Sequence, residues 1–151
     1  MKENPTYKGI RLIPKITENH IDGKKISKMK VKYAAQVFSR TVASNMGYLA
    51  DKGILEKECK DSADLLLFFD EVFDSVNGSF ANKNKFSKPL LQPVKPNLAH
   101  HKKWNEFKKI LKTMKFYKGN SSENVPTVNH WVWTLESIQI LVKNLEKKYN
   151  V

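Results

Sequence analysis

The feature that most limits what this sequence can fold into is a helical spacing of apolar residues, which recurs in four separate segments. The first segment opens at Ser27, a residue type that caps helices well, and we expect its helix to end near Ala50. Its apolar residues return at three- or four-residue steps, at Val31, Ala34, Ala35, Phe38, Val42, Met46 and Leu49. This spacing predicts one long amphipathic helix.

A second helix is predicted from Asp61 or Ser62 to Asn77, with Gly78 supplying a left-handed cap. Its apolar residues cover most of the circumference, so we expect it to be deeply buried. They are Leu65, Leu66, Phe68, Phe69, Val72, Phe73 and Val76.

The C-terminal third predicts two more helices. One carries an apolar stripe of Trp104, Phe107, Leu111 and Met114, and its other face is rich in lysine. After a polar stretch over residues 119–129, Trp131 and Trp133 lead into the last helix, which ends in Lys147 and Lys148. Its apolar positions are Leu135, Ile138, Leu141, Val142 and Leu145.

These segments predict a mainly α protein, and 151 residues suit a single compact domain. Residues 1–27 are expected to be a lead-in segment and residues 28–151 the helical domain. Long basic loops join the helices. The longest, over residues 78–99, contains three prolines and four lysines without periodicity, which is typical of a functional or mobile loop.

Charge suggests a polyanionic partner, because 27 Lys and Arg face 15 Asp and Glu, a formal net charge of +12. Cys59 is the only cysteine, which excludes an internal disulfide and a zinc site of the CxxC kind. Residues 1–11 lack an apolar signal-peptide core, and no stretch approaches the roughly 20 apolar residues that span a bilayer. We therefore expect a soluble intracellular protein with no membrane partner.

Lys28, Lys30 and Lys32 stand at the predicted start of the first helix, where free amide donors already favour negative charge. A phosphate group would resolve this conflict. The alternative is a solvated basic helix start that costs a few tenths of a kcal/mol for each lysine.

Nucleotide binding would here have to proceed without a glycine-rich loop, because neither GxxxxGK[ST] nor GxGxxG occurs. Lysines and helix ends would hold the phosphates, and Asp74 could accept both Watson–Crick-edge protons of guanine. The alternatives are that Asp74 is an exposed helix residue and Asn77 a simple cap.

Metal binding and catalysis are weakly supported. Asp70 and Asp74 lie four residues apart, but two carboxylates make a weak cation site. His20, His100, His101 and His130 lack partners at zinc-binding spacings and are interpreted as surface or loop residues. No catalytic signature such as HExxH or GxSxG appears.

The run KMKVKYAAQVFSRTVA, residues 28–43, closely resembles the signature helix of the GTP-binding insertion domain of P-element-like, THAP-type DNA transposases. PKITENHID before it resembles the segment that leads into that helix, and DSADLLLFFDEVFDSVNGS resembles the second motif of the family, FD-x-x-N. Lys88-Pro89-Leu90 and WTLESIQILVKNL, residues 133–145, continue the resemblance in order.

The resemblance implies a helical insertion into a split RNase H-like fold that binds GTP as a cofactor, without hydrolysis, and helps the transposase engage transposon-end DNA. It implies that Lys15, Lys30 and Val31 approach the nucleotide, that Ser39 hydrogen-bonds to it, and that Asp74 and Asn77 contact the base or ribose. Magnesium, where it accompanies GTP, is not assigned to protein ligands. Residues 1–27 would come from the preceding RNase H-like half, and the location would be nuclear.

The family's catalytic carboxylates lie in the RNase H-like halves, so we expect a noncatalytic chain: a fragment, a transposon relic or a domesticated gene product. CxxC is absent, and with it a zinc-binding THAP module. One rival is a basic helical module that binds DNA or RNA without a nucleotide site. A nuclease is disfavoured because no convergent set of acids is visible, and the oligomeric state is open.

Overall fold

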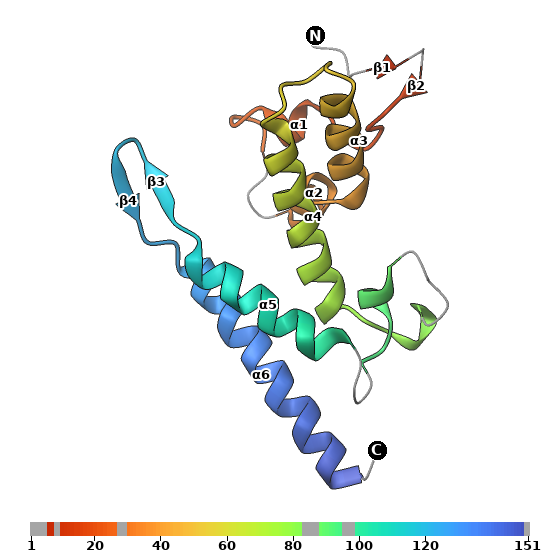
Figure 1. Cartoon of the computed structure of the whole chain (residues 1–151), viewed down its shortest axis with the longest axis vertical. Coiled ribbons are helices and arrows are strands. Elements are labelled where there is room, and N and C mark those ends of the chain that lie inside the picture. The colour runs from red at the N-terminus through yellow and green to blue at the C-terminus, as the bar shows by residue number, and fades with distance from the viewer. Residues whose placement is uncertain (1–5, 8–9, 27–29, 83–87, 95–98, 150–151) are drawn as a thin grey trace. The chain divides into compact units, whose positions relative to one another are not determined.

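The computed structural model describes residues 6–7, 10–26, 30–82, 88–94 and 99–149, with side-chain surroundings described from Leu12 onward except at residue 82. The chain is mainly helical, as the sequence predicts (Figure 1). In order, its elements are β1 Thr6–Tyr7, β2 Ile10–Arg11, α1 Glu18–Ile21, α2 Val31–Val37, α3 Arg40–Asp51, α4 Cys59–Val76, the 3-10 turns η1 Phe80–Asn82 and η2 Pro89–Leu91, α5 Ala99–Thr113, β3 Phe116–Lys118, β4 Ser121–Glu123 and α6 Pro126–Tyr149.

Contacts divide the chain into two units, Met1–Phe73 and Asp74–Val151. The predicted lead-in, residues 1–27, belongs to the same unit as the helices that follow it. Its origin in an RNase H-like half stays a prediction.

The single long helix predicted from Ser27 to Ala50 is wrong, because the chain breaks between α2 and α3 at Phe38 and Ser39. The Ser39 hydroxyl donates to the carbonyl of Gln36 at 2.9 Å and accepts from the amide of Val42 at 3.4 Å. Side-chain bonds of this kind compete with helical backbone bonds, so Ser39 ends one helix and caps the next. Ser27 and Lys28 lie outside the described residues.

In the first unit, small and aliphatic side chains from several helices form the core. Its buried apolar members are Ile16, Ala43, Leu49, Ala50, Ala63, Leu66 and Val72. Phe38 meets Phe69 of α4 edge to face, at 5.3 Å between ring centroids. Asn45 of α3 donates to the carbonyl of Leu12 at 3.1 Å, which ties the segment after β2 to α3.

Helix α4 begins at Cys59, slightly before the predicted start, and two expectations about it are wrong. It is not buried all round, since Leu65 is 45% and Phe73 43% exposed. Gly78 does not adopt a left-handed conformation either; among the described glycines, positive φ occurs at Gly53 and Gly119. Gly78 instead lies against the chain, because a Cβ there would overlap the carbonyl oxygen of Gln92.

The second unit is built on α5 and α6, which run antiparallel side by side and are joined by the β3–β4 hairpin (Figure 1). Its buried apolar core is Leu90, Trp104, Phe107, Leu111, Val132 and Leu135. The stripe predicted for α5 is confirmed at Trp104, Phe107 and Leu111, and Met114 lies just past the helix end. Helix α6 begins at Pro126, inside the stretch predicted as a polar loop, because proline suits the first helical position.

Part of α6 leaves apolar side chains in water. Ile140, Leu141, Leu145 and Tyr149 are between 44% and 62% exposed, although Leu141 and Leu145 belong to the predicted apolar face. We call these four residues the α6 apolar stripe. Among the helices of the described residues, none has the length and apolar character needed to cross a membrane.

Candidate functional site

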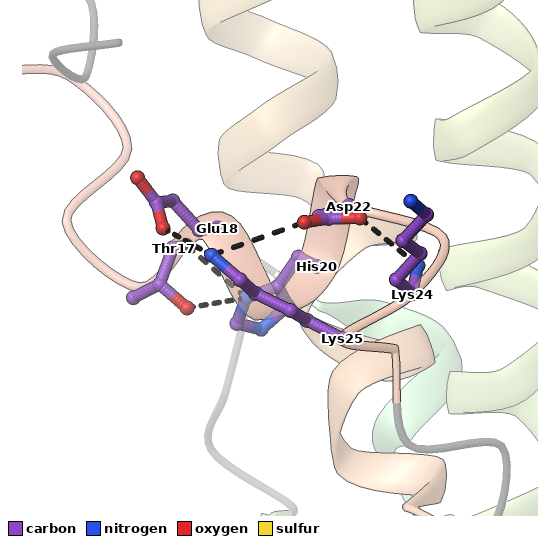
Figure 2. A network of polar contacts seen from close by, with 6 residues as sticks. All are labelled: Thr17, Glu18, His20, Asp22, Lys24 and Lys25. Atoms are coloured by element: carbon purple, nitrogen blue, oxygen red, sulfur yellow. Dashed lines mark hydrogen bonds and ion pairs between the residues drawn. The ribbon is translucent and has the colours of Figure 1, made fainter. Parts of the chain in front are cut away.

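The short helix α1 lies between two of the predicted site residues, Lys15 and Lys30. Its cap, Thr17, bonds to the ring of His20: the Thr17 amide donates to His20 Nδ1 at 3.1 Å, and the Thr17 hydroxyl lies 3.0 Å from the same nitrogen (Figure 2). A Thr at the cap and a side chain three residues later that bonds back form a reciprocal capping arrangement. This arrangement holds a helix that is too short to be stable on its own.

Charged residues around α1 close the turn that follows it. Lys25 donates to Glu18 at 2.8 Å and lies 3.8 Å from Asp22, whose carboxylate also accepts from the amide of Lys24 at 2.9 Å (Figure 2). The hydrogen bond to Glu18, helped by the attraction of the two carboxylates, raises the pKa of Lys25 above its ordinary value. These bonds shape the turn that leads from α1 toward Lys30.

His20 also joins α1 to α2, so its interpretation as a surface or loop residue is wrong. Because His20 Nδ1 accepts from Thr17, Nε2 carries the proton and donates to Gln36 Oε1 at 2.9 Å. The ring of His20 packs against Tyr33, with centroids 4.6 Å apart. The Thr-x-x-His spacing is the sequence feature that could have revealed this role.

Lys30 contacts the ring that packs against His20, because its ammonium group lies over the Tyr33 ring, 5.4 Å from the centroid. It is the N-cap residue of α2 and makes no side-chain cap hydrogen bond. Val31 follows as the first residue of α2 and is 69% exposed, and Lys15 is exposed in the turn before α1. The Lys30–Tyr33–His20 contacts thus link the start of α2 to the helix that follows Lys15.

Helix α2 has only seven residues, so the argument from a long helix dipole is weakened. An anion near Lys30 would be held mainly by lysine side chains. Ser39 lies at the other end of α2, and its hydroxyl already donates to Gln36. Because its hydrogen is already donated, this hydroxyl can only accept a hydrogen bond from a further partner.

Two further predicted site residues lie at the end of α4, in the second unit. Asp74 and Asn77 are one helical turn apart, and the Asn77 amide donates to the Asp74 carbonyl at 3.1 Å. Asp74 is not an exposed residue, because its side chain is 14% exposed and its Oδ2 accepts from Lys88 Nζ at 2.7 Å. Sequence reasoning did not identify Lys88 as the partner of Asp74.

The neighbour of Asp74 fixes this end of the helix. Ser75 is 1% exposed, and its hydroxyl accepts from the indole N–H of Trp104, itself fully buried, at 3.0 Å. His100, interpreted from the sequence as a surface or loop residue, is 2% exposed; its Nε2 donates to the Leu90 carbonyl at 3.0 Å. These bonds join the end of α4, the Lys88–Leu90 segment and α5 within one unit.

Metal chemistry has little support in the part of the chain that the structure describes. No group of three or more His, Cys, Asp or Glu side chains there could hold a metal ion. Asp70 is buried at 8% exposure and lies one turn before Asp74.

Comparisons with known proteins agree on one family. The model of the "TNP-like, GTP-binding insertion domain" matches residues 3–89. "Transposable element P transposase" of Drosophila melanogaster is 32% identical over 75 residues, which are 50% of this chain and 10% of that protein. The solved "Drosophila P element transposase strand transfer complex" matches with a TM-score of 0.80 and 25% identity, over 94% of this chain and 31% of that one.

This chain therefore spans a small part of each relative that it matches. Since the family model covers more than half of the chain, the chain belongs to the family of GTP-binding insertion domains of P-element-like transposases.

Proposed function

We propose that this chain binds GTP as a noncatalytic cofactor and that, as part of a P-element-like transposase, it helps the enzyme engage transposon-end DNA. Membership of a family described as GTP-binding supports the first statement. The matched Drosophila structure is a strand transfer complex, which supports the second. The net charge of +12 suits both polyanionic ligands.

In the first unit, Lys15 and Lys30 are the residues that we assign to the phosphates. Both are exposed, and ammonium groups are good partners for phosphate oxygens. The exposed side chain of Val31 offers an apolar contact beside Lys30. Ser39 contributes a hydroxyl that accepts a hydrogen bond, for instance from the ribose.

In the second unit, Asp74 is assigned to the guanine edge and Asn77 to the base or ribose. The observation that carries this assignment is the shielded carboxylate of Asp74, 14% exposed and already engaged in a charge-assisted hydrogen bond. A carboxylate offers about four acceptor positions, so Asp74 can bind Lys88 and still accept the two guanine protons. Adenine lacks this pair of donors, so Asp74 favours GTP over ATP.

The remaining assignments follow from the family. Catalytic carboxylates are assigned to other parts of the transposase, so this chain does not cut DNA or hydrolyse GTP. Any Mg²⁺ enters with the phosphates rather than through protein ligands. We assign the transposase to the nucleus, where its DNA substrate lies, and this chain's role within it is to hold GTP.

Titration of GTP, GDP and ATP into the chain by isothermal calorimetry tests the proposal. We expect GTP and GDP to bind and ATP to bind at least about tenfold more weakly, the equivalent of one charge-assisted hydrogen bond. Equal binding of GTP and ATP, or no binding at high micromolar concentration, contradicts the site. A chain that then still binds DNA or RNA is the basic helical module without a nucleotide site.

Lys30→Ala tests the phosphate contact, and the chain offers a matched control. We expect this variant to weaken GTP and GDP binding by about 1.5 to 3 kcal/mol, the range for a hydrogen bond to a charged group. Lys52 is also exposed and lies over a tyrosine ring, 5.7 Å from the centroid of Tyr48, but it is outside the proposed site. Lys52→Ala should leave GTP affinity unchanged, and an equal loss in both variants contradicts the assignment.

A further inference from the structure

The β3–β4 hairpin contributes no side chain to the core of its unit. All six strand residues are exposed, including Tyr117 at 64% and Phe116 at 38%. Gly119, with φ +61°, and Asn120 form the tight turn, and the hairpin projects past the ends of α5 and α6 (Figure 1). A two-stranded hairpin without a packed face is only marginally stable in water. Its aromatic side chains are available to a partner.

The charge of this end of the unit indicates what kind of partner fits. Residues 108–130 contain five lysines and one acid, Glu123. Lys109 and Lys112 are exposed on α5, Lys115 is exposed just before β3, and Lys118 is exposed at the end of β3. Lys112 lies 3.7 Å from Glu136 of α6, but both side chains are largely solvated, so this ion pair is weak. The hairpin end is therefore strongly positive.

The strand register separates the hairpin into two faces. Tyr117 pairs with Ser122, whereas Phe116 pairs with Glu123 and Lys118 with Ser121. Because successive side chains alternate between faces, Tyr117 and Ser122 share a face that the single acid does not occupy. This face presents the ring and hydroxyl group of Tyr117 and the hydroxyl group of Ser122, whereas Lys118 lies on the other face with Glu123.

We propose that Lys109, Lys115 and Lys118 form a binding surface for duplex DNA, with the β3–β4 hairpin as its tip. A two-stranded ribbon is narrow enough to enter the major groove, and exposed lysines neutralise the flanking phosphates. The contacts are to the phosphate backbone, so binding is independent of sequence. This surface rests on the proposed engagement of DNA and assigns it to a place on the chain, but it does not require a bound nucleotide.

The test is binding of the full chain to a fluorescent duplex, measured by anisotropy at several salt concentrations without GTP. The triple variant Lys109→Ala, Lys115→Ala, Lys118→Ala should bind at least about tenfold more weakly at low salt, and the slope of log K against log salt should fall by about 2.7, since each phosphate contact contributes about 0.9. Residues of this surface are exposed, so the variant should keep its circular dichroism spectrum.

The matched control removes the same charge from the same unit. Lys143, Lys147 and Lys148 are all exposed on α6, and replacing all three by alanine should change affinity far less than the hairpin triple. Equal losses in both triples, no loss in either, or no duplex binding by the unmodified chain overturns the proposal. A single strand that binds better than the duplex also overturns it. GTP titration of the same variants separates this failure from a failure of the nucleotide site.

Discussion

The ion pair between Lys88 and Asp74 allows a prediction that joins stability to nucleotide choice. It connects the end of α4 to the segment before η2, with 2.7 Å between Nζ and Oδ2. We consider the single variants Asp74→Asn and Lys88→Met and their combination. Each single change removes the ion pair, but only Asp74→Asn removes the carboxylate.

The magnitude follows from the burial of the two partners. A hydrogen bond to a charged group contributes about 1.5 to 3 kcal/mol, and a fully buried pair costs more to break. Here the side chains are 14% and 30% exposed, so solvent screening reduces the loss, and we expect about 1 to 2 kcal/mol for each single variant. The double variant should lose little more than either single variant, which gives a coupling energy of about 1 kcal/mol.

The assay can report on the right unit, because all three tryptophans, Trp104, Trp131 and Trp133, lie in the second unit. Urea unfolding followed by tryptophan fluorescence therefore measures the part of the chain that contains the pair. Additive losses, with coupling below about 0.3 kcal/mol, would show that the pair contributes nothing in solution.

Nucleotide choice then separates the two residues. Lys88→Met keeps the carboxylate, so it should retain the preference for GTP over ATP, whereas Asp74→Asn should lose it because an amide cannot accept two protons in the same way. If Lys88→Met loses the preference as fully as Asp74→Asn, the carboxylate does not read guanine by itself and the reasoning is refuted.

Two further predictions concern the backbone. Gly78→Ala should destabilise the second unit by about 1 to 3 kcal/mol in urea unfolding, because the new Cβ meets the Gln92 carbonyl and pushes against the 3.2 Å hydrogen bond from the Ser79 amide to the Leu91 carbonyl. As a control, Gly47→Ala lies in open space within α3 and should stabilise the chain by up to about 1 kcal/mol. The same sign for both variants would contradict the steric argument. Ser39→Ala should lower the free energy of unfolding by about 1 kcal/mol through loss of the α3 cap, measured by thermal melting in far-UV circular dichroism. Ser44→Ala, on the exposed side of α3, should leave the free energy of unfolding unchanged. Equal melting curves for the two variants would show that the cap is unimportant.

The spacing of apolar residues predicted those helices that bury one side along their length, because their buried positions then recur at the helical period. The stripe of Trp104, Phe107 and Leu111 is buried because α5 packs on one side along its length. The break at Ser39 was not predicted, because apolar spacing continues through it and the hydroxyl bonds that end α2 leave that spacing unchanged. Hairpin β3–β4 was missed because three-residue strands are too short to show an alternating pattern.

The sequence could indicate candidate site residues only within single segments, and not the contacts between distant segments. The sequence assigns Lys30 from one segment and Asp74 and Asn77 from another, the family resemblance adds Val31, and all four assignments stay predictions. Lys88 joins Asp74 from 14 residues away, across a loop without periodicity, so no spacing rule identifies the pair. His100 looked like a loop residue because its burial depends on the Leu90 carbonyl and the Trp104 ring, which only the folded unit brings together.

The α6 apolar stripe has a consequence for the behaviour of the chain in solution. This stripe favours association between copies of the chain, whereas the net charge of +12 makes the copies repel one another. The Debye length falls from about 10 Å at 0.1 M salt to about 3 Å at 1 M, so added salt screens the repulsion, and kosmotropic salts such as sulfate also strengthen apolar contacts. Colloidal stability should therefore decrease as salt rises, and we expect this chain to precipitate in the high-salt washes that strip nucleic acid from a basic protein.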